Sequence, residues 1–249
     1  MSATPAQPHR LLVLGGTGLV GREVVTAALS NDAISAVLSF GRKPPPVDPS
    51  VAGFSKLQHT ALDFEALLAE KEGGPETQKL RAADADSVVV ALGTTRATAG
   101  SAENFERIDR LYVLKAAEAA RTSKPQTLAY VSSGGANASS WFLYPKSKGL
   151  TEEGLARLGY SSALTFRPGV LIAPGGRQER RLAELLAVKV VPRLPFIGSS
   201  LSTATPTLGR ALVKAVLSPP TTVGEETTLR DGSKLRVVSN SDISRLGAE

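Results

Sequence analysis

The sequence predicts an α/β protein whose core is a doubly wound, mostly parallel sheet. Apolar runs bounded by turn residues alternate with segments of helical periodicity, as expected for successive βαβ units. Six such runs occur, which is the strand number of a doubly wound sheet. The first run also leads straight into a glycine-rich turn and a helical pattern, which is how such a sheet commonly begins.

The expected strands follow one another at short intervals. In chain order they are residues 10–15, 35–41, 56–61, 87–93, 127–133 and 162–169. The clearest helix is residues 101–121, where apolar side chains recur at three- and four-residue steps and Ser101 supplies a cap. The proline-rich residues 43–53 must form a loop. From residue 177 onward the pattern weakens into one or two helices and a late strand.

Length and composition fit one globular domain. The chain has 249 residues, of which 42% are hydrophobic and 21% charged, so it can bury a full core. We expect a single domain over residues 1–249, with residues from about 170 to 249 forming a small extension on the substrate side. The absence of cysteine excludes disulfides, cysteine zinc sites and thiol nucleophiles. His9 and His59 are not spaced as metal ligands, so no metal site is expected.

The chain carries a formal net charge of +6 at pH 7. Such a charge suits nucleic acid, an anionic membrane surface or an anionic small ligand. The basic residues are scattered and aromatic residues make up only 5%, which argues against nucleic acid and for an anionic cofactor. No apolar segment approaches the roughly 20 residues of a membrane helix, and no signal-peptide pattern occurs, so we expect a soluble, cytoplasmic chain.

Three glycines after the first strand predict a phosphate-binding loop. Gly15, Gly18 and Gly21 lie in LLVLGGTGLVG, and the following REVVTAALS has helical character. The first glycine permits a tight turn, the second lets a pyrophosphate approach the backbone, and the third lets the helix pack closely on the strand. A merely tight turn is the alternative. The expected contacts to a dinucleotide are made by Gly15, Thr17, Gly18, Leu19 and Val20.

The end of the second strand indicates which dinucleotide binds. An acidic residue there would accept hydrogen bonds from a ribose 2′-hydroxyl, whereas an arginine would pair with a 2′-phosphate. The sequence has SFGRKPPP, with Arg42 and Lys43 and no carboxylate. Because the guanidinium fork suits phosphate, this favours NADP(H) over NAD(H). The alternative is a pair of solvated cations at the start of a loop.

Residues at the ends of the third and fourth strands complete the expected cofactor cleft. Asp63 could reach the adenine group, or it could cap the next helix. Leu92, Gly93 and Thr94 lie at the carboxyl edge of the fourth strand, where doubly wound sheets bind their ligands.

A serine pair, a tyrosine and a lysine after the fifth strand predict oxidoreductase chemistry. Ser132 and Ser133 end the strand, and Tyr144 and Lys148 are four residues apart, which places them on one face of a helix that Pro145 would help to start. A free tyrosine has a pKa near ~10, and a nearby ammonium lowers that value. The phenol could then exchange a proton with a carbonyl or alcohol oxygen while hydride moves to or from nicotinamide. A half-buried tyrosine beside a solvated lysine is the alternative.

Two further groups lie near this segment. Trp141 and Phe142 could line an apolar substrate pocket, or they could pack in the core. Arg177, Arg180 and Arg181 could bind an acidic substrate, a phospholipid head or a protein partner, or they could simply face water on an amphipathic helix.

The sequence resembles the short-chain dehydrogenase/reductase superfamily. Within it, the chain is similar to the atypical branch that contains the Tat-interacting-protein-type oxidoreductases and the fungal proteins found in mitochondrial proteomes. The matching stretches are GGTGLVGREVV, ALGTTR, GSAENFERIDRLYVLKAAEAAR, YVSSGGANASSWFLYPKSKG and LTFRPGVLIAPGGRQERRLAE. Together they span most of residues 10–185.

The resemblance implies a Rossmann-like domain that binds NADPH, with Ser133, Tyr144 and Lys148 in the superfamily's catalytic positions. It also implies that Pro168, Gly169 and Val170 lie beside the nicotinamide. One departure concerns proton transfer, because Asp109 stands where many relatives carry an asparagine that anchors a relay water.

Two functions follow from these expectations. The first is an NADPH-dependent reductase of a carbonyl substrate, in which Tyr144 donates the proton, Lys148 tunes it and Ser133 orients the substrate. The second is a non-catalytic, NADPH-responsive protein that regulates or binds a partner. Because of the resemblance to mitochondrial-proteome proteins, peripheral association with the mitochondrial outer membrane is the alternative to a cytoplasmic location, and basic patches could support it.

Overall fold

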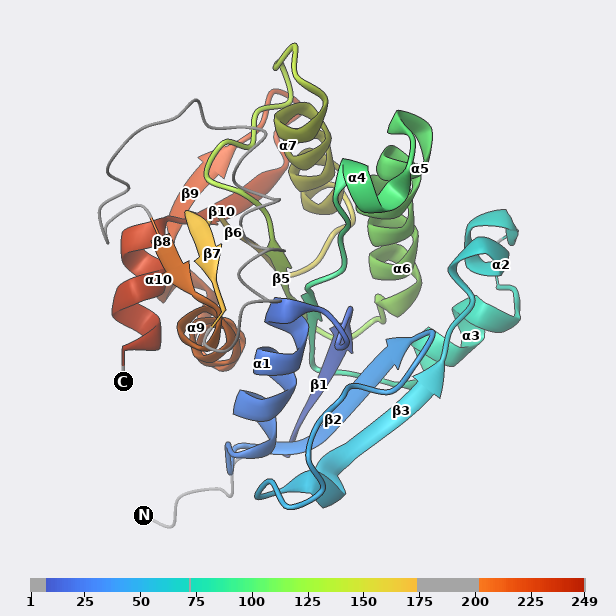
Figure 1. Cartoon of the computed structure of the whole chain (residues 1–249), viewed down its shortest axis with the longest axis vertical. Helices are drawn as coiled ribbons and strands as arrows, with labels where there is room; N and C mark the ends of the chain where they lie inside the picture. Colours follow the sequence, from blue (N-terminus) through green and yellow to red (C-terminus); the bar gives the residue numbers. More distant parts are fainter. Residues whose placement is uncertain (1–7, 72, 174–201, 249) are drawn as a thin grey trace.

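The computed structural model describes residues 8–71, 73–173 and 202–248 (Figure 1). Within them, eight strands form one sheet in the order β3-β2-β1-β4-β5-β6-β10-β9. The strands are β1 (His9–Leu14), β2 (Ile34–Gly41), β3 (Leu57–Ala61), β4 (Ser87–Val90), β5 (Thr127–Val131), β6 (Ser162–Phe166), β9 (Glu225–Thr228) and β10 (Lys234–Val238). All neighbours are parallel except β9, which runs antiparallel to β10. The prediction of a Rossmann-like, mostly parallel sheet is confirmed.

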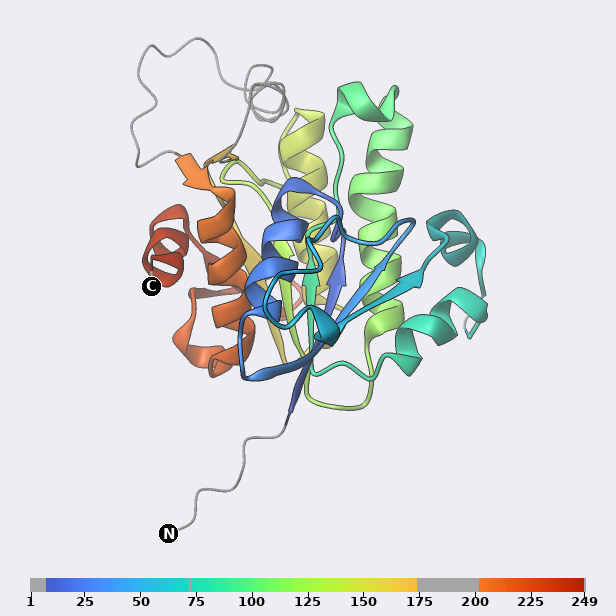
Figure 2. The same ribbon diagram turned by 60° about the horizontal axis from the view of Figure 1, so that its bottom comes forward.

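Helices cover both faces of this sheet (Figures 1 and 2). The longer ones are α1 (Leu19–Leu29), α3 (Pro75–Ala82), α6 (Tyr112–Ala120), α7 (Leu143–Ala156), α9 (Thr205–Leu217) and α10 (Asn240–Gly247). The shorter segments are α2 (Phe64–Ala69), α4 (Arg96–Ala99), α5 (Ala102–Glu106), η1 (Phe54–Lys56), η2 (Arg107–Leu111) and η4 (Pro220–Thr222). Helices α1, α9 and α10 share one hydrophobic core, whereas α3, α6 and α7 contribute to the other.

The central strand shows why its sequence is continuously apolar. In β1, Leu11 and Val13 belong to the core under α1, while Leu12 and Leu14 belong to the opposite core. All four side chains are fully buried. A parallel strand that is covered on both faces needs apolar residues at every position, rather than the alternation of a half-exposed strand.

Four predicted strands end earlier than expected, and β4 and β6 do so by three residues. β4 ends at Val90, the register partner of Leu14, because β1 itself stops where Gly15 turns away. β6 ends at Phe166, two residues before Pro168, which has no N–H to continue the ladder. The chain then enters β7 (Val170–Ile172), which pairs with β8 (Ser202–Ala204) in a separate two-stranded sheet.

The other expectations for the chain have mixed outcomes. The helix predicted over residues 101–121 is present as α5, the π-helical turn η2 and α6, and the Ser101 side chain accepts the Asn104 N–H as a cap. Residues 43–53 form a loop, as expected. The late strand corresponds to β10, and β9 beside it was not predicted. The helix expected from residue 177 lies outside the described residues. No helix in the described part of the chain is long and apolar enough to cross a membrane.

Candidate functional site

The glycine-rich turn between β1 and α1 is sterically tight. Gly15 has φ +87°, a left-handed conformation that side chains rarely adopt, and a Cβ there would lie 2.6 Å from the Leu92 backbone nitrogen. A Cβ on Gly21 would lie 2.0 Å from the Gly15 carbonyl oxygen. The first and third glycines therefore let the turn close against β4 and let α1 pack against the turn.

Gly18 differs from these two glycines because a Cβ there would make only ordinary van der Waals contacts. A Cβ there would meet its first neighbour, the Gly15 carbonyl oxygen, only at 3.4 Å. Gly18 is the N-cap of α1, no side chain caps this helix end, and the first turn has no acidic residue. The exposed N–H groups and the positive end of the helix dipole are suited to a phosphate. Val20 is buried in the core, so any contact it makes with a cofactor is through its backbone.

A pocket of about 310 Å³ opens next to this turn. It is lined by Gly15, Gly16, Thr17, Phe40, Gly41, Arg42, Lys43, Phe64 and Leu92. The fold thus gathers five of the predicted cofactor residues from three separate strand ends. Arg42 and Lys43 are exposed and form no ion pair with any other described residue. Phe40 and Phe64 were not predicted, although an aromatic residue near a strand end is a usable signal for a base-binding wall.

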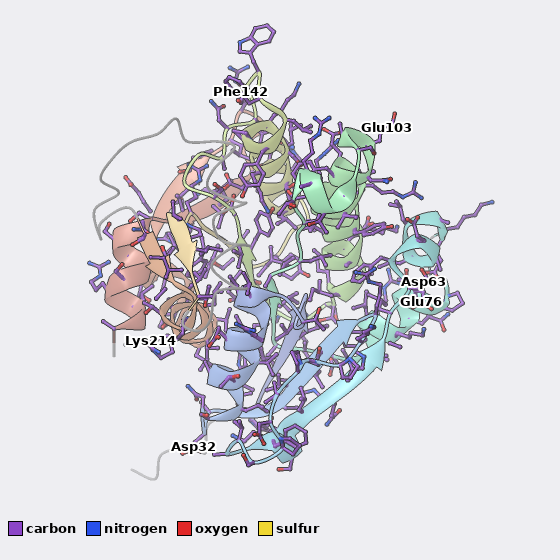
Figure 3. The ribbon with its side chains drawn as sticks, viewed as in Figure 1. Asp32, Asp63, Glu76, Glu103, Phe142 and Lys214 are labelled. Carbon is purple, nitrogen blue, oxygen red and sulfur yellow. The ribbon has the colours of Figure 1, made fainter. Side chains whose placement is uncertain are left out.

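Asp63 is engaged in capping. Its side chain accepts hydrogen bonds from the backbone N–H groups of Glu65 and Ala66, at 2.9 and 3.1 Å, at the start of α2. Its own N–H donates to the Glu76 carboxylate at 3.1 Å, and the two residues lie close together in Figure 3. The capping alternative is therefore confirmed, and an additional contact to adenine stays a prediction.

The backbone that follows Leu92 lies beside the predicted catalytic lysine. Leu92 lines the pocket, and a Cβ on the next residue, Gly93, would lie 3.7 Å from Lys148 Nζ and 3.0 Å from Asp109 Oδ1. Gly93 therefore brings its backbone close to a buried ion pair. Thr94 follows, half-buried, before the short helix α4.

Lys148 is held by two buried groups. Its Nζ donates to the Tyr130 hydroxyl at 3.0 Å and lies 3.1 Å from Asp109 Oδ1. The latter contact is an ion pair without hydrogen-bond geometry. Burial acts to lower the pKa of Lys148, but the Asp109 carboxylate and the neighbouring phenols outweigh it, so the pKa lies well above its usual range. Burial also raises the pKa of Tyr130 far above its usual range, so its phenol is neutral at pH 7.

Tyr144 lies in the first turn of α7, as predicted from Pro145, on the same side as Lys148. Its ring centroid is 6.0 Å from Lys148 Nζ and 6.1 Å from the centroid of Phe105. The side chain is half-buried. The ammonium donates no hydrogen bond to the Tyr144 hydroxyl within the described structure, so the two groups interact through space.

The loop that carries Ser133 packs between α7 and the end of β6. The Asn137 N–H donates to the Pro145 carbonyl at 2.9 Å, and a Cβ on Gly149 would lie 2.1 Å from the Ala138 nitrogen. On its other side, the Gly134 N–H donates to the Pro168 carbonyl at 3.0 Å. The fold therefore brings the serine loop, the start of α7 and the turn after β6 together, as the prediction required.

The two serines have different surroundings. Ser133 is half-buried, and its hydroxyl accepts a long hydrogen bond of 3.4 Å from the Gly135 N–H. Ser132 is 5% exposed, and its hydroxyl has no hydrogen-bond partner within the described part of the chain. A buried hydroxyl without a partner is costly; because the Ser132 oxygen is buried, Ser133 is the more accessible of the two serines.

The turn after β6 is anchored by the C-terminal segment. The Gly169 N–H donates to Asn240 Oδ1 at 2.9 Å and approaches Thr203 Oγ1 at 3.3 Å. Pro168 is buried, and Val170 begins β7. The segment near residue 170 is thus tied to the C-terminal part of the chain, although its place beside a nicotinamide stays a prediction.

The aromatic pair before α7 is not part of the core. Trp141 is 100% exposed and Phe142 76% exposed, and Figure 3 shows Phe142 at the tip of the molecule. The alternative that these side chains pack in the core is wrong, because the loop that carries them projects beyond α7. The predicted Arg177, Arg180 and Arg181 lie outside the described residues.

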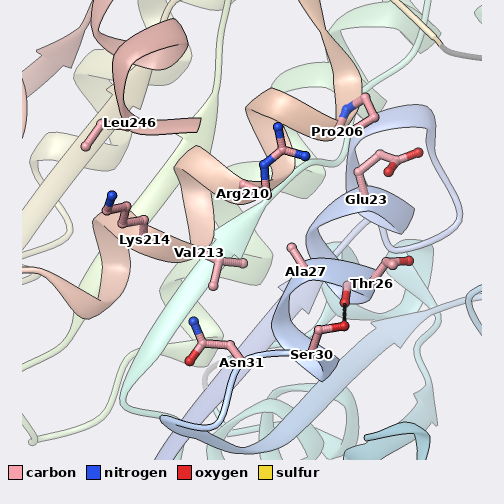
Figure 4. A pocket seen from close by; sticks show the side chains of 10 residues that line it. All are labelled: Glu23, Thr26, Ala27, Ser30, Asn31, Pro206, Arg210, Val213, Lys214 and Leu246. Carbon is pink, nitrogen blue, oxygen red and sulfur yellow. Dashed lines mark hydrogen bonds between the residues drawn. The ribbon is translucent and has the colours of Figure 1, made fainter. Parts of the chain in front are cut away.

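A larger pocket of about 470 Å³ lies elsewhere, between α1, α9 and α10 (Figure 4). Its lining includes Glu23, Asn31, Arg210 and Lys214, and none of the predicted site residues. Ligands of doubly wound sheets bind at the carboxyl ends of the strands. The smaller pocket at the glycine turn is therefore the candidate site.

Comparisons with known proteins show the family of the chain. The sequence profile of the NAD dependent epimerase/dehydratase family matches residues 11–188. Protein FMP52, mitochondrial, of Candida albicans is 38% identical over 167 residues, which cover 67% of this chain and 68% of that protein. Protein HTATIP2 of Rattus norvegicus is 32% identical over 241 residues, which cover 96% and 93%.

Solved structures share the fold at low sequence identity. The YIR035C short chain dehydrogenases/reductase from Saccharomyces cerevisiae superposes with a TM-score of 0.61 at 15% identity, covering 96% of this chain and 99% of that one. The matched profile contains the glycine turn, the serine loop and the Tyr144–Lys148 helix on which the candidate site is built. The chain therefore belongs to the NAD dependent epimerase/dehydratase family.

Proposed function

We propose that the protein is an NADPH-dependent reductase of a carbonyl compound. The observation that carries this proposal is that Leu92 lines the glycine-loop pocket, while the next residue, Gly93, lies beside Lys148 on the helix that also carries Tyr144. The family and the fold support an oxidoreductase role. The preference for NADPH over NADH and the carbonyl substrate belong to the proposal.

The residues of the pocket fit a dinucleotide. The start of α1 at Gly18, which no side chain caps, would hold the pyrophosphate. Arg42 and Lys43, which are exposed and unpaired within the described structure, would hold a 2′-phosphate. Phe40 and Phe64 would provide apolar walls for the adenine.

The remaining residues would act on the substrate oxygen. A bound nicotinamide cofactor supplies the hydride. The carbonyl oxygen would receive the proton of the Tyr144 hydroxyl, and the phenolate left behind would be reprotonated from water. Ser133 or Ser132 would hold that oxygen in place. The Lys148 ammonium, 6.0 Å from the Tyr144 ring, would stabilise the phenolate through space.

One observation favours a second function, a cofactor-responsive binding protein without turnover. The Lys148 ammonium is already engaged by Asp109 and Tyr130 and does not contact the Tyr144 hydroxyl. In this alternative, NADPH would order the cleft, and a protein partner would bind selectively to the NADPH-bound form. The location, cytoplasmic or peripheral at the mitochondrial outer membrane, is also part of the proposal; relatives that are named mitochondrial support the second location.

The deciding experiment is NADPH oxidation by wild type and Tyr144→Phe against a panel of aldehydes, ketones and quinones. Both proteins are first shown to bind NADPH by fluorescence titration. Turnover that is lost in the variant supports the reductase. Tight NADPH binding without tyrosine-dependent turnover against any member of the panel supports the binding protein.

A further inference from the structure

A buried carboxylate contacts the lysine of the candidate site. Asp109 lies in the π-helical turn η2, is 1% exposed, and places Oδ1 3.1 Å from Lys148 Nζ. Neither of its carboxylate oxygens has a hydrogen-bond partner in the described structure. Burying a carboxylate without hydrogen bonds is unfavourable unless an opposite charge compensates it. The ion pair with Lys148 is therefore the interaction that keeps this carboxylate in place.

The groups around the ammonium come from three elements. Asp109 approaches it from η2, Tyr130 from β5 and Tyr144 from its own helix, α7. Arg110, next to Asp109 in the chain, pairs instead with Glu106 at 3.0 Å. Among the described residues, the ammonium of Lys148 and the carboxylate of Asp109 are thus adjacent opposite charges that offset each other.

We propose that Asp109 is a positioning residue that offsets the charge of Lys148 and thereby adapts the site to carbonyl reduction rather than alcohol oxidation. This inference rests on the proposed function. An ammonium without a counter-ion would favour the phenolate of Tyr144. With Asp109 3.1 Å from the ammonium, that attraction is offset.

Carbonyl reduction and alcohol oxidation require opposite protonation states of the Tyr144 side chain. In reduction, the carbonyl carbon gains the hydride supplied by the reduced cofactor, the Tyr144 O–H bond breaks, and the carbonyl oxygen gains the proton. Oxidation is the reverse and requires a phenolate that takes the proton from the alcohol. A site in which a carboxylate offsets the attraction of the ammonium for the phenolate therefore suits reduction.

The test removes the carboxylate and keeps its shape. Asp109→Asn leaves the Lys148 charge without a counter-ion, whereas Asp32→Asn makes the same charge change at an exposed position far from the site, labelled in Figure 3. The first readout is phenolate absorbance in a pH titration of the cofactor-free proteins. The chain has four tyrosines, and subtracting the titration of the matched Tyr144→Phe variant isolates the signal of Tyr144 from that of the other three. The second is the pH dependence of reduction and of oxidation.

We expect Asp109→Asn to move the Tyr144 titration down by about one pH unit or more. Alcohol oxidation at pH 7 should rise about tenfold, and reduction should lose its activity at a correspondingly lower pH. Asp32→Asn should change neither readout. If Asp109→Asn does not fold, Asp109→Ser makes the same charge change with a smaller side chain.

A titration that stays within a few tenths of a unit of wild type, or moves upward, overturns the inference. The titration does not depend on turnover. If Tyr144→Phe leaves NADPH oxidation unaffected, the reductase proposal fails, while the absorbance result still decides whether Asp109 controls the charge at Tyr144.

Discussion

Asp109 and Lys148 form an ion pair that is almost completely buried, with Oδ1 and Nζ 3.1 Å apart. The carboxylate comes from the π-helical turn between α5 and α6, and the ammonium from the second turn of α7. The pair joins two helices beneath the backbone of Gly93, where the cofactor pocket meets the candidate catalytic helix. The same buried pair therefore lies both between two helices of the fold and at the candidate site.

Removing only the lysine should destabilise the fold strongly. Lys148→Met leaves the Asp109 carboxylate buried without a partner, which typically costs about 3–5 kcal/mol. The double variant Lys148→Met/Asp109→Leu removes both charges and should recover most of that loss. Urea denaturation of the single and double variants measures the coupling. Equal losses in Lys148→Met and in the double variant would argue against a compensating pair.

Alkaline pH should weaken the fold through Lys148 and Tyr130. Burial acts to lower the pKa of Lys148, but Asp109 and the phenols outweigh it, so the pKa of Lys148 is raised. Burial raises the pKa of Tyr130. A group whose pKa is higher in the folded state stabilises the protein below its unfolded pKa, and that contribution disappears as the pH rises through the folded value. We therefore expect the free energy of unfolding to fall above about pH 10, and less steeply in Tyr130→Phe. Urea denaturation at several alkaline pH values tests this; identical slopes would remove Tyr130 from the explanation.

The glycine turn should not tolerate a side chain at Gly15. Gly15→Ala places a Cβ 2.6 Å from the Leu92 nitrogen in a residue with φ +87°, so both strain and a backbone clash result. Gly232→Ala is the matched control, because Gly232 has φ +84° but nothing within 4 Å of its Cβ position. We expect Gly15→Ala to abolish NADPH binding, measured by fluorescence titration. Gly232→Ala should cost only the strain of about 1–3 kcal/mol and should bind normally.

Arg42 should discriminate between the two dinucleotides. A charge-assisted hydrogen bond contributes about 1.5–3 kcal/mol, so Arg42→Ala should weaken NADPH binding about tenfold to a hundredfold. NADH has no 2′-phosphate, and its affinity should change little. Calorimetric titration of both cofactors measures the difference. Similar affinities for NADH and NADPH that Arg42→Ala does not alter would mean that Arg42 and Lys43 are surface cations without a role in selection.

Truncating an exposed and a buried aromatic residue near the site should change the free energy of unfolding by very different amounts. Trp141 is 100% exposed, so Trp141→Ala should change the free energy of unfolding by no more than about 0.5 kcal/mol. Phe105 is 1% exposed and packs beside Tyr144, so Phe105→Ala should cost about 3–5 kcal/mol. Thermal denaturation compares them. A large loss in Trp141→Ala would show that the loop packs against the protein in solution.

The sequence by itself determined the local features of this protein. Continuous apolar runs such as residues 11–14 indicate strands covered on both faces, and the periodicity after Ser101 indicates the helix that became α5 and α6. The glycine spacing indicated a tight turn, because backbone sterics act within a few residues. The four-residue spacing of Tyr144 and Lys148 indicated a shared helix face, because residues four apart lie about one helical turn from each other.

Only the tertiary structure decided which groups meet. Asp109 and Lys148 are 39 positions apart, and their pairing depends on how η2, β5 and α7 pack around Gly93. Phe64 joins Arg42 in one pocket because parallel strands bring their carboxyl ends to the same edge. The exposure of Trp141 and the position of β9 were likewise undetermined, since burial and strand pairing follow from contacts between distant segments rather than from local pattern.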